Sequence, residues 1–142
     1  MKNNILDDQI ENLRNFKIEI YKLRKIYDLL ELGNLKTEVK KCITILEKIY
    51  KEVAINSNKI KKIQKIIDYY IITLTKILNN YITFKENKIL TKESEKLYVK
   101  IEQFIPKVKE SFEKIYTSLF SDEILDIDIE IEVMIKELGI KK

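Results

Sequence analysis

Four lysines crowd the start of the predicted central helix, and they form the first group able to bind a ligand. They are Lys59, Lys61, Lys62 and Lys65. The beginning of a helix carries free backbone N–H groups and the positive end of the dipole, so lysines there are locally unfavourable. Such a group can hold phosphate or another oxyanion. The alternative, which we favour, is an exposed, solubilising cluster that nearby acids neutralise in part.

Six acidic residues near the C-terminus form the second group. Carboxylate oxygens are the ligands that Mg²⁺ and Ca²⁺ prefer, so a divalent metal site is one interpretation. The spacing is not that of a calcium-binding loop, and helix capping together with a solvated face explains the same residues. We therefore expect no cofactor, with a divalent metal as the alternative. The candidate ligands are Asp122, Asp126, Asp128 and Glu130, and Glu123 and Glu132 complete the group.

The residues that the chain lacks exclude several classes of enzyme. It has no histidine, which excludes Ser-His-Asp and Cys-His catalytic groups and zinc held by histidine. Its two glycines, Gly33 and Gly139, are isolated, so there is no glycine-rich phosphate loop. The single cysteine, Cys42, lies in an apolar helical series, which predicts a buried thiol rather than a nucleophile. Whether the protein is an enzyme stays open.

Composition limits the fold. The length of 142 residues predicts a single domain, residues 1–142. The chain has only two glycines and one proline, too few for the many turns of a β fold. The net charge of +4 is mixed along the chain, which is typical of a solvated surface and predicts no nucleic-acid partner. Without a signal peptide or a run of about 20 apolar residues, we expect a cytoplasmic protein.

Apolar residues at steps of three and four predict long helices. The central one spans Lys59–Lys85, about 40 Å if continuous, and it should pack against other helices. Before it come two helices, from about Asp7 to Glu31 and from Asn34 to about Val53, with Asn34 as the cap of the second. The central series is Ile60, Ile63, Ile67, Tyr70, Leu74, Ile77, Tyr81 and Phe84, flanked by Ile66, Ile71, Leu78 and Ile82. The apolar series of the second helix is Leu35, Val39, Cys42, Leu46, Ile49 and Val53.

A fourth helix begins at Thr91, which forms a cap with Ser94 or Glu93. Pro106 lies inside it and predicts a kink near Glu102–Pro106 that costs about 3 kcal/mol unless packing compensates. Two shorter helices meeting there are the alternative. The predicted core side is Leu97, Ile101, Phe104, Val108, Phe112, Ile115 and Leu119.

The last segment fits two periods. Residues Ile127–Val133 alternate between apolar and acidic side chains, as a strand does. The same segment also has one apolar helical face, and a lone strand would lack a partner, so we predict a short helix capped by Asp126 or Asp128 and ended by Gly139. The expected fold is an all-α, antiparallel bundle of four long helices and this short C-terminal helix. The apolar helical face is Ile124, Ile127, Ile131, Met134, Ile135 and Leu138.

A set of aromatic and acidic helix motifs resembles one bacterial family. The set covers about Asn56 to Ile140, and more weakly the second helix, and it resembles the bromo-chloro-indolyl phosphate hydrolysis protein family. The motifs are Asp68-Tyr69-Tyr70, Thr73, Lys76, Leu78, Tyr81, Phe112-Glu113-Lys114, Leu119-Phe120, Asp122, Leu125-Asp126-Ile127 and Ile131-Glu132-Val133-Met134. The family pattern has a proline where Ile72 stands.

The resemblance implies an association with toxic-anion (tellurite) resistance proteins, and family members commonly carry hydrophobic segments ahead of this region. The chain is then either a soluble relative or the cytoplasmic part of a longer protein. Two functions are open. The first, which we favour, is a module that binds a membrane-associated or stress-response protein through an apolar groove, with a second copy of the chain as a further partner. The second is a metal-dependent phosphoester hydrolase, in which the acidic segment holds the metal and the lysines steer the phosphate.

Overall fold

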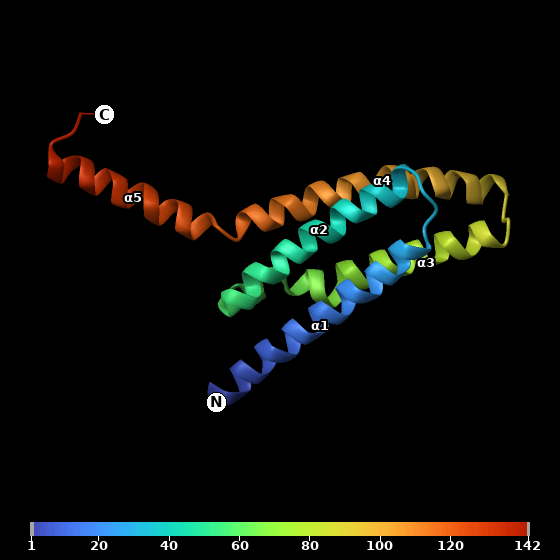
Figure 1. Ribbon diagram of the computed structural model, residues 1–142, viewed down its shortest axis with the longest axis horizontal. Coiled ribbons are helices and arrows are strands. Elements are labelled where there is room, and N and C mark those ends of the chain that lie inside the picture. The colour runs from blue at the N-terminus through green and yellow to red at the C-terminus, as the bar shows by residue number, and fades with distance from the viewer. Residues whose placement is uncertain (1, 142) are drawn as a thin grey trace.

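The computed structural model describes the backbone of residues 2–141 and the side chains of residues 6–141. Within these residues the chain is helical and has no strand, which confirms the all-α class. Figure 1 labels the α-helices from α1 to α5. Between α2 and α3 lie two short helical segments, η1 and η2. The elements are α1 (Lys2–Leu29), α2 (Asn34–Ile55), η1 (Ser57–Ile63), η2 (Ile66–Tyr70), α3 (Ile71–Glu86), α4 (Lys92–Ser118) and α5 (Ser121–Leu138).

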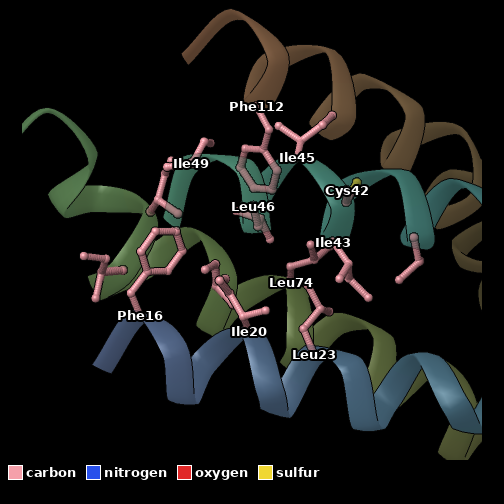
Figure 2. Close-up of a cluster of buried hydrophobic side chains, with 14 of the residues drawn as sticks. Phe16, Ile20, Leu23, Cys42, Ile43, Ile45, Leu46, Ile49, Leu74 and Phe112 are labelled. Carbon is pink, nitrogen blue, oxygen red and sulfur yellow. The ribbon is translucent and has the colours of Figure 1, made fainter. Parts of the chain in front are cut away.

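The first four α-helices share one core. Helix α2 packs along α1 on one side and along α4 on the other, and α1 also packs along α3. In contrast, α3 meets α4 over much less of its length. Figure 2 shows Phe16, Ile20 and Leu23 of α1 facing Leu46 of α2, with Phe112 of α4 above. The predicted series of the second helix is confirmed from Val39 to Val53, since every member of that stretch is buried.

Residues 57–86 are helical throughout, as predicted for Lys59–Lys85, but they do not form one uniform α-helix. Segment η1 is a 3₁₀ helix and η2 is a π-helix, in which the Ile71 N–H donates to the Ile66 carbonyl five residues back. A π turn holds one residue more than an α turn, so it rotates the next part of the helix by about one position. The predicted core residue Tyr70 is therefore 39% exposed. After η2 the buried face of α3 is the predicted flank, Ile71, Leu78 and Ile82, together with Leu74.

Helix α4 begins with the predicted cap. The Ser94 N–H donates to Thr91 Oγ1 at 3.0 Å, and the Thr91 N–H donates to Ser94 Oγ at 2.9 Å. The helix continues through Pro106 to Ser118, so the alternative of two shorter helices is wrong; a kink at this proline stays a prediction. The predicted core side is only partly correct, because Ile105 is fully buried whereas Phe104 is 44% exposed.

Cys42 is the buried thiol that the sequence predicts. Its side chain is fully buried, and its Sγ lies 3.9 Å from the Ile105 carbonyl oxygen, across the contact between α2 and α4. Burial, and then the negative charge of Glu38, raise the pKa of Cys42 to about 12. Since the thiolate is the nucleophile, the folded protein keeps this cysteine unreactive.

Alkylation tests this environment. At mildly alkaline pH we expect iodoacetamide to leave Cys42 unmodified in the folded protein, because a rise in pKa from 9.0 to about 12 lowers the thiolate fraction about a thousandfold. In denaturant the same thiol should react fully. Intact-protein mass spectrometry measures both, and equal rates in the two conditions would contradict the buried placement.

Helix α5 confirms the choice of helix over strand in the last segment. It has 18 residues and is not short. It begins at Ser121 after Phe120, so capping by Asp126 or Asp128 is wrong. Gly139 ends it as predicted, with a φ of 65° that favours glycine.

The apolar face of α5 does not join the core. The helix has no buried residue, and Figure 1 shows it projecting away from the other helices beyond the end of α4. No helix in residues 2–141 combines the length and the apolar character needed to cross a bilayer.

The residue that caps the beginning of α2 also differs from the prediction. Gly33, not Asn34, precedes α2 as the cap residue, with a φ of 154° and no side-chain cap hydrogen bond. Asn34 is the first residue of the helix. Glycine tolerates this backbone conformation because it has no Cβ.

Candidate functional site

The two charged groups predicted separately from the sequence meet in the structure. Lys59 on η1 lies 2.7 Å from Glu52 on α2 and 2.8 Å from Glu123 on α5, measured from its Nζ to a carboxylate oxygen. Lys62 lies 3.6 Å from Asp122. The acids at the start of α5 therefore neutralise part of the lysine cluster. We call Lys59, Glu52, Glu123 and the neighbouring Phe120 the Lys59 junction.

Lys59 is enclosed on three sides at this junction. Its side chain is only 8% exposed, and its Nζ lies 4.8 Å from the centre of the Phe120 ring. Hydrogen bonds to Glu123 and then to Glu52 raise the pKa of Lys59, and the bond from Lys59 lowers the pKa of Glu123. A buried ammonium group needs such partners, because burial alone disfavours its charge. The junction therefore holds the first turn of α5 against α2 and η1.

The four lysines of the predicted anion site fall into two pairs, one with ion pairs to acids and one without. Lys59 and Lys62 face acids, whereas Lys61 and Lys65 are exposed and have no ion pair among the described residues. The donors of Lys59 are directed to carboxylates and are not free for an oxyanion. Anion binding by the remaining lysines stays a prediction.

The predicted metal ligands are not gathered into one group. Asp122 pairs with Lys62, and the candidates that come after it lie on the exposed surface of α5. In the part of the chain that the structure describes, no three side chains of Asp, Glu, Cys or His lie close enough together to hold a metal ion. The residues present therefore do not form a prepared site for Mg²⁺ or Ca²⁺ here, and these ligands stay a prediction.

An apolar groove lies where α3 and α4 separate, and the sequence did not predict it at this place. It has a volume of about 470 Å³, and we call it the α3–α4 groove. The Asp68-Tyr69-Tyr70 motif was the available signal, but its second tyrosine was assigned to the core. The residues that line the groove are Tyr69, Tyr70, Thr73, Leu74 and Ile77 from η2 and α3, and Phe104, Lys107, Val108, Ser111, Phe112 and Ile115 from α4.

Comparison with known protein families gives a match. Residues 6–134 match the model of a family described as 5-bromo-4-chloroindolyl phosphate hydrolysis protein. The chain belongs to this family. The match begins in α1 and not near Asn56, so it is longer than the resemblance seen in the motifs, and it includes both the Lys59 junction and the α3–α4 groove. Searches of curated proteins and of solved structures found no match.

A second cavity also lies within the region that matches the family. It has a volume of about 670 Å³ and lies where the turn between α1 and α2 approaches α3 and α4. On its wall the Tyr81 hydroxyl donates to Glu102 at 3.1 Å. Burial, and then this hydrogen bond, raise the pKa of Tyr81 to about 12. Lys85 lies 4.5 Å from the centre of the Tyr98 ring at the same place.

Tyr81 should make the protein sensitive to alkali. The folded state holds the phenol proton more tightly than the unfolded state, so the contribution of Tyr81 to stability is complete below pH 10 and is lost as the pH rises from about 10 to about 12. We expect the urea midpoint to fall more steeply over this interval in the wild type than in Tyr81→Phe. Cys42 titrates in both proteins, so it does not affect the comparison. Parallel pH curves would contradict this assignment.

Proposed function

We propose that this protein is a protein-interaction module whose binding surface is the apolar face of α5 together with the α3–α4 groove. The observation that carries the proposal is that α5 buries none of its residues, although it is rich in large apolar side chains. On one face of the helix these side chains are each half exposed or more, and they are Ile124, Ile127, Ile131, Met134 and Leu138.

Physical chemistry favours a partner for this helix. A large contiguous apolar surface is rare on proteins that act alone, because its exposure to water is unfavourable. The 18 residues of α5 also lack the packing of an amphipathic face from which most helices in proteins gain their stability. An amphipathic helix placed in an apolar groove is a common way for proteins to recognise one another. The proposal includes a cytoplasmic location and, in line with the resemblance to the family, a partner connected with toxic-anion resistance.

Photo-crosslinking tests the module in living cells of the native host. Ile131 and Ile129 lie on opposite faces of α5 and are matched in exposure, at 51% and 52%. A photoreactive residue at position 131 should give one defined adduct whose yield falls when a peptide of the α5 sequence competes. The same group at position 129 serves as the control. Equal labelling at both positions, or none, would count against a binding face on α5.

The description of the family favours phosphoester hydrolysis as the second function, and an assay separates the two. We expect purified protein with Mg²⁺ or Mn²⁺ to give no turnover of 5-bromo-4-chloroindolyl phosphate above the blank, because Asp122 is paired with Lys62 and the described acids are not grouped. Metal-dependent turnover that Asp126→Asn abolishes would establish the hydrolase and reject our preference.

A further inference from the structure

We propose that two copies of this chain exchange α5, so that α5 of each copy lies in the α3–α4 groove of the other. This inference rests on the proposed function and names the partner as a second copy. Four sets of observations carry it, namely the open groove, the unpacked helix, their charges and the direction of α5.

The groove and the helix match in chemical character, and the helix is long enough to cover the groove. The groove lies along the one side of the core where two helices barely touch, and mostly apolar side chains line it. An 18-residue helix is about 27 Å long, so α5 can run along the groove over several turns. The apolar stripe available to enter it is Ile124, Ile127, Ile131, Met134 and Leu138, which are spaced three and four residues apart.

The charges beside the groove and beside the stripe are opposite and equally spaced. Lys100, Lys107 and Lys114 repeat every seven residues along α4, so they lie on one face, and Lys107 lines the groove itself. On α5, Glu130 and Glu137 have the same spacing beside the apolar stripe. None of these five side chains has an ion pair among the described residues. This is the arrangement by which flanking charges select a partner in coiled coils.

The net charge of the helix also favours this occupant. Helix α5 carries seven acidic residues and one lysine. Lys107 is the single charged side chain among the described residues that line the groove, so no acid there repels α5. An acidic amphipathic helix therefore meets an apolar surface bordered by cations.

The Lys59 junction explains why the helix comes from a second copy. Glu123 and Phe120 hold the beginning of α5 at Lys59, and from there the helix points away from the four-helix core (Figure 1). While these contacts persist, α5 does not fold back onto its own α4. An exchange between two copies occupies both grooves at once and leaves no unpaired α5, so the assembly closes as a dimer.

The oligomeric state of the full chain tests the exchange. We expect sedimentation equilibrium to show a dimer, and Ile131→Asp to weaken it about thirtyfold or more, the scale of a central interface residue. Ile129→Asp is the matched control, because it adds the same charge at the same exposure on the opposite face, and we expect it to leave the dimer intact. A monomeric wild type, or equal effects of the two variants, would overturn the proposal.

Charge reversal identifies the groove as the acceptor. The combined variant Lys100→Glu, Lys107→Glu and Lys114→Glu should dissociate the dimer, and adding Glu130→Lys with Glu137→Lys should restore it. Glu123 is left unchanged because it belongs to the Lys59 junction. All five substituted positions are exposed, so folding is preserved. If the dimer persists after the lysine substitutions, or if the two glutamate substitutions do not restore it, the α3–α4 groove is not the acceptor of α5.

Disulfide trapping distinguishes a second copy from closure within one chain. One copy carries Ser111→Cys in the groove, and the other carries Ile127→Cys, Ile131→Cys or Met134→Cys in turn; buried Cys42 does not interfere. A disulfide between the mixed copies supports exchange. A disulfide formed only within a chain that carries both cysteines, or only between two α5 helices, overturns it. If exchange fails but position 131 still crosslinks to another protein in cells, the interaction module stands without the dimer.

Discussion

Deletion of Lys76 is expected to unfold the protein, whereas deletion of Tyr69 should leave it folded. Both side chains are exposed, so the comparison measures the backbone and not the lost contacts. Removing one residue from an α-helix rotates everything after it by about 100°. Without Lys76 the buried side chains of Leu78 and Ile82 leave the core. At about 2–5 kcal/mol for each large core side chain, this loss is comparable with the whole stability of a typical domain, about 5–15 kcal/mol.

The π segment η2 makes the Tyr69 deletion different. A π turn contains one residue more than an α turn, so removing one residue converts it into an α turn. The buried residues on either side, Ile67 and Ile71, then keep nearly the same directions. We expect the free energy of unfolding to stay within about 2 kcal/mol of the wild type, the range of an ordinary point substitution. Urea denaturation monitored by circular dichroism measures both variants, and equal destabilisation would mean that η2 does not set the register of α3.

Ile105→Ala should cost about 2–5 kcal/mol of unfolding free energy, and its neighbour Phe104→Ala only about 1 kcal/mol. The smaller side chain has the larger effect because Ile105 is fully buried between α4 and α2, whereas Phe104 is 44% exposed in the α3–α4 groove. The sequence pattern predicts Phe104 on the core side of α4, whereas the structure buries Ile105. The two alanine variants therefore test which face of α4 is buried.

Chemical denaturation of both alanine variants provides the measurement. They are compared at one protein concentration, since association adds to apparent stability. Ile129→Asp, which lies far from both residues on α5, is the control for a change that leaves the core intact. A larger cost for Phe104→Ala than for Ile105→Ala would show that α4 is rotated about its axis relative to α2.

Local patterns predicted the helices and several of their ends. Thr91 and Ser94 form a cap through neighbouring groups, and Gly139 ends α5 through its own backbone freedom, so both are visible in a short stretch of sequence. The series around Cys42 was correct because α2 has helices on both sides. The helix ends were therefore predictable because they depend on adjacent residues, and the buried series of α2 was predictable because helices cover it on two sides.

The π segment was not predictable from the same patterns. The series through Ile67, Tyr70 and Leu74 fits a continuous α-helix, and the flanking series through Ile71 and Leu78 fits a rotated one. Which series is buried depends on where α1 and α4 lie, and a periodic pattern contains no such information. The same reason explains why α4 buries Ile105 and not Phe104.

The candidate site depended still more on contacts between distant residues. The sequence showed a lysine cluster and an acidic cluster, but their meeting at Lys59 and Glu123 joins segments that are 64 positions apart. The stripe on α5 was recognised as apolar, yet a pattern cannot show whether its partner lies in the same chain. The Lys59 junction directs α5 away from the core, and this direction became visible only in three dimensions.

Separating the acids of α5 from the basic remainder of the chain gives the molecule a large electric dipole moment. Two such molecules in dilute buffer are turned toward each other before they touch, the acidic end of one approaching the cationic side of the other. Added salt shortens the reach of this field, so their encounter rate falls with ionic strength while the lifetime of the complex changes little.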